Sequence, residues 1–111
     1  MRNLRLTRLK SKNKIEHLFR EGNILRSDGL LLRFHLKESL LLYAGVAVSK
    51  RNFKRAVDRN RIKRQLRESI KVNASLIPSG GHCMLIYTGK KRPLFLDLKK
   101  HTALLFSKLN K

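Results

Sequence analysis

The segment RNRIKRQLRE, residues 59–68, sets five basic side chains and one acidic side chain around two apolar ones. At about 100° per residue of an α-helix, Ile62, Leu66 and the later Ile70 share one narrow arc. The pattern predicts a helix over residues 56–73 that has one packed edge and a broad basic face. Such a helix cannot bury its apolar edge alone, so the rest of the chain has to supply a core on which it packs.

The chain as a whole is as basic as this helix. Its 27 Lys and Arg against 7 Asp and Glu give a formal net charge of +20 in 111 residues. Self-repulsion at this level costs stability unless a polyanion relieves it, so the expected partner is negatively charged. Because 41% of the residues are hydrophobic, there is enough apolar surface to fold. We expect a single domain over residues 1–111, in which residues 1–12 form a partly flexible basic arm.

The remaining patterns predict a short first helix, a group of strands and a closing helix. Residues 13–21 are expected to form a helix that begins at Asn13, with Glu16 completing a capping box, and stops at Gly22. The runs NILRS, GLLLRFHL and LLLYAGVAVS are typical of strands, HCMLIYT of a buried central strand, and residues 95–109 of an amphipathic helix. The order predicts an α/β fold, an α+β sandwich with a small sheet. No apolar run is long and unbroken enough for a signal peptide or a membrane span.

The ionisable side chains form no catalytic or metal-binding motif. The seven acids are scattered over different predicted elements, and the four histidines lack the spacing of metal ligands. The single cysteine, Cys83, lies in the predicted central strand, where a buried and inert thiol is expected. One cysteine allows no intramolecular disulfide, which fits a reduced cytoplasm. We therefore expect this chain to have no catalytic residue, no metal site and no organic cofactor of its own.

The basic side chains, in contrast, are concentrated in one region. Residues 50–71 hold ten basic and two acidic side chains. The planar guanidinium of Arg suits bidentate contacts with phosphate and stacking on bases. The region therefore predicts a surface that binds a nucleic-acid backbone. Arg59 projects close to the apolar arc, so we expect its stem to lie along the core surface with the guanidinium at the rim.

The same region carries a family resemblance. The segment AVSKRNFKRAVDRNRIKRQLRESI, residues 47–70, resembles the signature of the bacterial ribonuclease P protein subunit. In that family a strand ends in Ser-Lys-Lys or Ser-Lys-Arg and leads into a helix with Arg-Asn-Arg, a Lys-Arg pair and a further Arg. The segment RLTRLKSKNKIEHLFREG is similar to the family's N-terminal arm and first helix. The resemblance covers most of residues 4–106.

The resemblance implies a role as a cofactor of a ribozyme. In the family, an RNA with bound Mg²⁺ removes the 5′ leader of precursor tRNA, and the protein binds both that RNA and the leader, with no obligate protein partner. The resemblance also implies a small mixed sheet with a left-handed βαβ crossover, the ribosomal protein S5 domain 2-like fold. Matched by position, the residues expected to face the catalytic RNA and the leader are Lys50, Arg51, Lys54, Arg55, Arg59, Asn60, Arg61, Lys63, Arg64 and Arg67.

The family holds the leader in a cleft between the first helix and the sheet. Carried over to this chain, Ile15 and Phe19 would form the cleft wall, and Arg33 and His35 would face it from a strand. From the residues alone, an apolar side chain four positions after Ile15 on an amphipathic helix is a core residue more often than a cleft residue.

Strand periodicity alone also leaves the face of the cleft strand open. The run LLLRFHL puts either Leu32 and Phe34 or Arg33 and His35 on the open face, and we expect the second pair.

Other nucleic-acid binders share part of the pattern. A ribosomal or other structural RNA-binding protein without a processing role would have the same charge, size and lack of catalytic groups. The Arg-Asn-Arg spacing favours the ribonuclease P assignment over this alternative. A helix-turn-helix DNA-binding module is disfavoured, because a strand precedes the basic helix in place of a partner helix.

Overall fold

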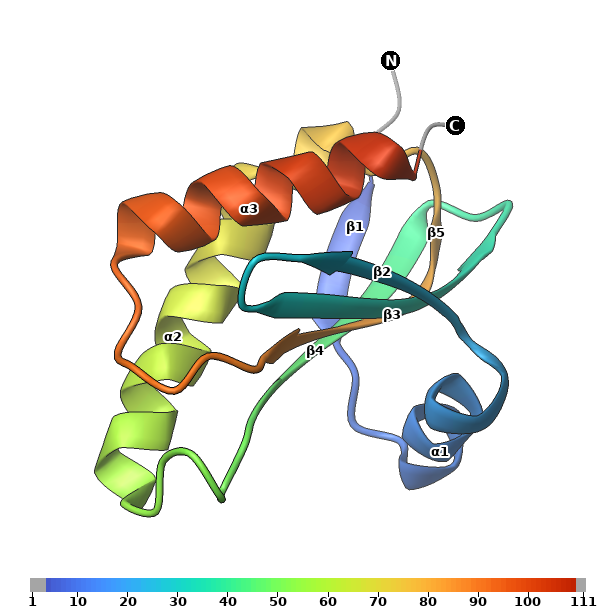
Figure 1. Cartoon of the computed structure of the whole chain (residues 1–111). Coiled ribbons are helices and arrows are strands. Elements are labelled where there is room, and N and C mark those ends of the chain that lie inside the picture. Colours follow the sequence, from blue (N-terminus) through green and yellow to red (C-terminus); the bar gives the residue numbers. More distant parts are fainter. Residues whose placement is uncertain (1–3, 110–111) are drawn as a thin grey trace.

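The computed structural model describes residues 4–109. Within this range the chain forms a five-stranded sheet and three α-helices, with a short 3₁₀ turn after the second helix (Figure 1). In chain order the elements are β1 (Arg5–Arg8), α1 (Lys12–Glu21), β2 (Asn23–Ser27), β3 (Leu30–Lys37), β4 (Leu41–Val48), α2 (Ala56–Val72), β5 (Gly80–Tyr87) and α3 (Phe95–Lys108). The α/β fold predicted from the sequence is thereby confirmed.

The strands run in the order β1-β4-β5-β3-β2 across the sheet. β1 and β5 are both parallel to β4, whereas β3 is antiparallel to β5 and to β2. α2 is the crossover between the parallel neighbours β4 and β5, and β5 is the central strand, as predicted. The left-handed sense of this crossover stays a prediction from the family resemblance.

The two faces of the sheet are covered by different helices. Because successive strand side chains point to opposite faces, Leu32, Leu42 and Leu85 lie on the face covered by α2 and α3, and none of the three is exposed to solvent. Leu66 and Phe106 complete this main core from the two helices. Burying a side chain of this size stabilises the fold by about 1.5–3 kcal/mol relative to leaving it in water. The predicted apolar arc of α2 is therefore its packed edge.

The opposite face of the sheet is covered only in part, by α1. Leu18 of α1 is 1% exposed and packs in a small cluster with Leu9 and Met84. Figure 1 shows α1 standing apart from the α2 and α3 layer. Since one short helix cannot cover five strands, polar and basic side chains occupy the rest of this face.

The start of α1 differs from the capping box expected at Asn13. The helix begins one residue earlier, and Ser11 is its N-cap, with its Oγ accepting a hydrogen bond from the Lys14 backbone N–H at 3.4 Å. Asn13 is therefore inside the helix and Glu16 does not complete a capping box. Ser and Asn have similar N-cap preference, so the pattern alone could not choose between two candidates two residues apart.

The segment expected as a basic arm contains regular structure. Residues 5–8 form the edge strand β1, in register with residues 41–44 of β4, and Leu9 is 7% exposed. Residues 1–3 of the predicted arm lie outside the described residues. Basic and apolar residues alternate through this segment, a pattern that suits an edge strand with cations on its solvent side.

Two glycines with positive φ help to position β3 and β5. Gly29, in the tight turn between β2 and β3, has φ of 75°. Gly81, at the start of β5, has φ of 119°, and a Cβ there would collide with the His35 carbonyl oxygen. Residues other than glycine rarely adopt this backbone conformation. Glycine therefore lets β5 approach β3 closely and fixes the position of His82.

Candidate nucleic-acid interface

The loop between β4 and α2, residues 49–55, presents basic side chains on an anchored backbone. The Phe53 N–H donates to the Ser49 carbonyl at 3.1 Å, and Asn52 Nδ2 donates to two carbonyls just after β5 at 3.2 Å each. Phe53 itself is buried in the main core. The exposed cations of the loop are Lys50, Arg51, Lys54 and Arg55. Their positions are therefore set by a backbone that is tied to the core.

Arg59 holds this loop to the start of α2. Its Nη1 donates hydrogen bonds to the carbonyls of Phe53 and Lys54, at 2.8 Å each. Sequence analysis predicts a guanidinium that reaches out at the rim. In the structure it turns back and is bonded to the loop instead. Bonds from a side chain to backbone carbonyls leave no periodic pattern, so sequence reasoning missed this structural role.

The predicted RNA-facing residues of α2 fall into two groups. On a helical wheel four of them lie within about 100° of one another, on the side opposite Ser69, which contacts α3. Arg61 lies about 60° beyond this group. We call the group of four, together with the loop cations, the basic stripe. Its helical members are Asn60, Lys63, Arg64 and Arg67.

The cations of the stripe have no acidic partner within residues 4–109. Among the described residues, side chains of opposite charge lie within 4.0 Å only in the pairs His17–Glu21 and Arg92–Asp58. Arg67 lies with Arg8 along a groove of about 250 Å³ between β1 and α2. The stripe therefore presents uncompensated cations, which are the groups that neutralise a phosphate backbone.

Phe19 lies outside the core. Its side chain is 45% exposed, and the guanidinium carbon of Arg33 lies 4.7 Å from the centre of its ring. Arg33 Nη1 also donates to the Phe19 carbonyl at 3.2 Å. Arg33 Nε is buried and has no hydrogen-bond partner among the described residues. An exposed ring and an unsatisfied donor thus occur together on one side of α1.

Ile15, the other predicted wall residue, is half-buried and packs on the small cluster that contains Leu18. Its side chain mainly supports α1. The choice of strand face is settled by burial, because Leu32 is fully buried in the main core and Phe34 packs against it. Arg33 and His35 accordingly face the side of the sheet on which α1 lies.

The structure does not bring His35 together with Phe19. His35 contacts His17, with ring centroids 5.7 Å apart and the planes at 76°. His17 and Phe19 are two residues apart on α1, so they point about 200° apart around the helix axis. Arg33 and His35 therefore lie on opposite flanks of α1, and the four residues predicted for one cleft divide between two sites.

The cysteine and the possible metal ligands are the other side chains that sequence analysis considered for chemistry. Burial raises the pKa of the Cys83 thiol to about 12, as expected for an inert side chain. Among residues 4–109, no three His, Cys, Asp or Glu side chains lie together so as to hold a metal ion. None of the helices in that range is long and apolar enough to span a membrane.

Comparison with known proteins identifies similar chains. The family model described as Ribonuclease P matches residues 4–110. The ribonuclease P protein component of Borreliella afzelii is 34% identical over 70 residues, which are 62% of this chain and 63% of the relative. That of Coprothermobacter proteolyticus is 41% identical over 81 residues, 73% of this chain and 66% of the relative. The alignments thus span just under two thirds of these relatives' length.

A solved structure shares the fold. The ribonuclease P protein from Thermotoga maritima superposes with a TM-score of 0.78 at 23% identity, over 92% of this chain and 96% of that chain.

Proposed function

Because this chain belongs to the ribonuclease P protein family, we propose that it is the protein cofactor of ribonuclease P and acts in removing the 5′ leader from precursor tRNA. In this role it binds a catalytic RNA and the leader and supplies no catalytic residue. The reduced cytoplasm, suited to a chain with one buried thiol, is the compartment in which we place it.

The basic stripe is the surface for the catalytic RNA. In the described part of the chain its cations have no acidic partners, and its backbone is anchored by Arg59 and Asn52. Neutralising phosphates releases counterions from the RNA, which supplies affinity without sequence recognition. The continuity of these unpaired cations from the loop into α2, in the order of the family signature, is the observation that carries the proposal.

The Phe19 flank of α1 is the surface for the leader. The exposed ring offers a face on which an unpaired base can stack. The stacked Arg33 adds a cation beside it, and its buried Nε is a donor that a leader phosphate can satisfy. Phe19 and Arg33 therefore supply the two kinds of contact that a single strand requires.

The chemistry belongs to Mg²⁺ held by the RNA. Activating water and stabilising the leaving oxygen are tasks that hard cations with oxygen ligands perform. The acids of the described chain are not grouped for such a site. Its own part is to position the RNA strands and to reduce their mutual repulsion.

Co-purification and reconstitution test the proposal. The protein should form a one-to-one complex with ribonuclease P RNA in preference to a ribosomal RNA fragment of equal length, and the complex should cleave precursor tRNA. Arg64→Ala should weaken assembly, whereas Lys100→Ala, which removes an exposed cation from α3, serves as the control of equal charge. Equal binding of both RNAs with no stimulation of cleavage would instead identify a structural RNA-binding protein.

A further inference from the structure

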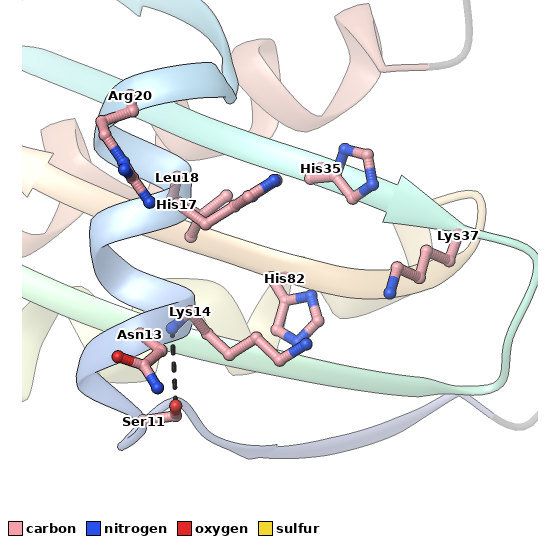
Figure 2. Close-up of a pocket in the computed structure, with 9 residues that line it drawn as sticks. All are labelled: Ser11, Asn13, Lys14, His17, Leu18, Arg20, His35, Lys37 and His82. Carbon is pink, nitrogen blue, oxygen red and sulfur yellow. Dashed lines mark hydrogen bonds between the residues drawn. The ribbon is translucent and has the colours of Figure 1, made fainter.

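A cavity of about 460 Å³ lies on the flank of α1 that faces away from Phe19. Figure 2 shows Lys14 and His17 of α1 opposite His35 and Lys37 of β3, with His82 of β5 between them. The cavity is therefore built by three elements that are distant in sequence, and the register of β3 with β5 sets His35 directly beside His82.

The lining of this cavity is cationic. It holds two lysines, one arginine and three histidines, and no Asp or Glu is among the lining residues. Outside the lining, the carboxylate of Glu21 lies 2.9 Å from His17 Nε2 and is itself largely exposed. The ammonium groups of the two lysines that line one cavity repel each other, and an anion between them removes that repulsion.

A second cavity of about 530 Å³ adjoins the first and shares Ser11, Lys14 and His82 with it. Its wall includes Leu9 and Tyr43, so it offers an apolar surface next to the cations. The ring of Tyr43 stacks on that of His82, with centroids 5.3 Å apart and planes at 13°. An aromatic and apolar surface beside a cationic one fits a molecule with a flat ring and a phosphate.

We propose that these two cavities form a nucleotide-binding site, with a phosphate between Lys14, Lys37 and His82 and its base against Tyr43. The site goes beyond the proposed leader flank, since it lies across α1 from Phe19. Its ligand chemistry is that of a nucleotide phosphate, whether in a free nucleotide or within an RNA strand.

The site has a defined pH dependence. Desolvation first, then the charges of Lys14, Lys37, His35 and His17, lower the pKa of His82. These groups face it from α1 and β3, the ring of Tyr43 stacks on it from β4, and Arg8 and Lys10 line the adjoining cavity with it. A bound phosphate opposes this effect and favours protonated His82, so binding takes up a proton. If binding takes up one proton, affinity falls by up to about tenfold per pH unit from the lowered pKa of free His82 upward, until the pKa of the phosphate-bound imidazole is passed.

The test uses the free full-length chain, without ribonuclease P RNA, so that it is independent of the proposed function. Nuclear magnetic resonance of the histidine and tyrosine rings follows titrations with inorganic phosphate, adenosine 5′-monophosphate and the trinucleotide ApApA. The nucleotides should shift the signals of His82 and Tyr43 and bind more tightly than inorganic phosphate. Comparison of the monophosphate with ApApA decides whether a terminal or a chain phosphate is preferred.

The pH arm uses ApApA at pH 6 and pH 8. Its phosphodiesters keep one charge each over this range, whereas a phosphomonoester has a second pKa of about 6. ApApA should bind more tightly at pH 6, and His82→Asn should reduce this difference, whereas an unchanged difference would show that His82 does not contact the phosphate.

Lys37→Ala should weaken binding by about tenfold, as expected for the loss of a charge-assisted hydrogen bond. Lys100→Ala is the control, and melting temperatures verify that each variant is folded. Equal losses in Lys37→Ala and Lys100→Ala, or signal shifts spread over the whole basic surface, would show general electrostatic attraction and overturn the site.

Discussion

Phe19 illustrates how position on a helix decides between a core and a binding role. Leu18 points directly into the sheet, so the next residue is turned about 100° away and reaches the edge of the covered area. The ring is therefore left half in solvent, where Arg33 covers one part of it. Periodicity could not separate these outcomes, because the face that packs depends on how α1 crosses the sheet.

Replacing Phe19 by Ala should therefore affect RNA more than stability. Loss of one stacked base costs about 1–3 kcal/mol of binding, or about one to two decades of affinity. The loss should appear for precursor tRNA and be absent for mature tRNA, which has no leader. Both affinities and the melting temperature are measured. A fully buried Phe would instead cost about 3–5 kcal/mol of stability, and a loss of that size would show that Phe19 belongs to the core.

His82 predicts how stability responds to acid. Its pKa is lowered in the folded protein from the ordinary 6.5, so the unfolded chain binds more protons below that value. Folding stability should fall as pH drops through 6.5 towards the folded-state pKa. Thermal melts at pH 7.5 and 5.5 should show a smaller decrease for His82→Asn than for the parent chain. An identical decrease in both proteins would assign the acid sensitivity to other groups.

Arg59 and Arg64 should respond differently to truncation. Arg59→Ala removes two hydrogen bonds to loop carbonyls, and bonds to charged groups contribute about 1.5–3 kcal/mol when well shielded. Because Arg59 is half-exposed, we expect a loss of about 1–2 kcal/mol, together with weaker RNA binding. Arg64→Ala should weaken RNA binding at unchanged stability. Urea denaturation provides the comparison, and equal stability of both variants would contradict the anchoring role of Arg59.

At the scale of elements, the sequence predicted most helices and strands, but it missed β1 and the docking position of α1. α2, α3 and the strand group stand within a residue or two of the expected ranges because their apolar spacing is regular. β1 was missed because an edge strand needs only four residues and gains its order from β4. The division of Arg33 and His35 between two flanks of α1 could not be predicted, since it depends on the docking position of that helix.

The packed edge of α2 should determine its stability. Leu66 is fully buried between the sheet and α3. Leu66→Ala removes its contacts and leaves a cavity, at a cost of about 2–5 kcal/mol. Thermal and urea unfolding should both register this loss, and addition of the RNA partner should restore part of it by mass action. A change below about 1 kcal/mol would mean that the core of α2 collapses around the smaller side chain.

At the scale of the whole molecule, charge governs assembly. A chain of net charge +20 binds RNA chiefly by replacing counterions, so the logarithm of affinity should fall linearly with the logarithm of salt concentration. If the protein neutralises about six to ten phosphates, raising salt from about 50 to 200 mM should lower affinity by about 10³–10⁵. Filter binding over this range measures the slope. A flat response would contradict an interface dominated by phosphate contacts.

The same charge predicts where catalysis resides. Seven dispersed acids among 27 cations cannot concentrate Mg²⁺, since each bound ion would be repelled by its surroundings. Purified protein alone should therefore cleave no precursor tRNA at any Mg²⁺ concentration, while the RNA partner alone should cleave it slowly at high salt and high Mg²⁺. Adding the protein should lower the Mg²⁺ requirement, because its cations replace counterions, and should tighten binding of leader-bearing substrate.

Initial rates across an Mg²⁺ series, with and without protein, measure both effects, and Lys100→Ala should behave as the parent chain. Cleavage by rigorously RNA-free protein that a single carboxylate or histidine substitution abolishes would place the reaction in the protein itself.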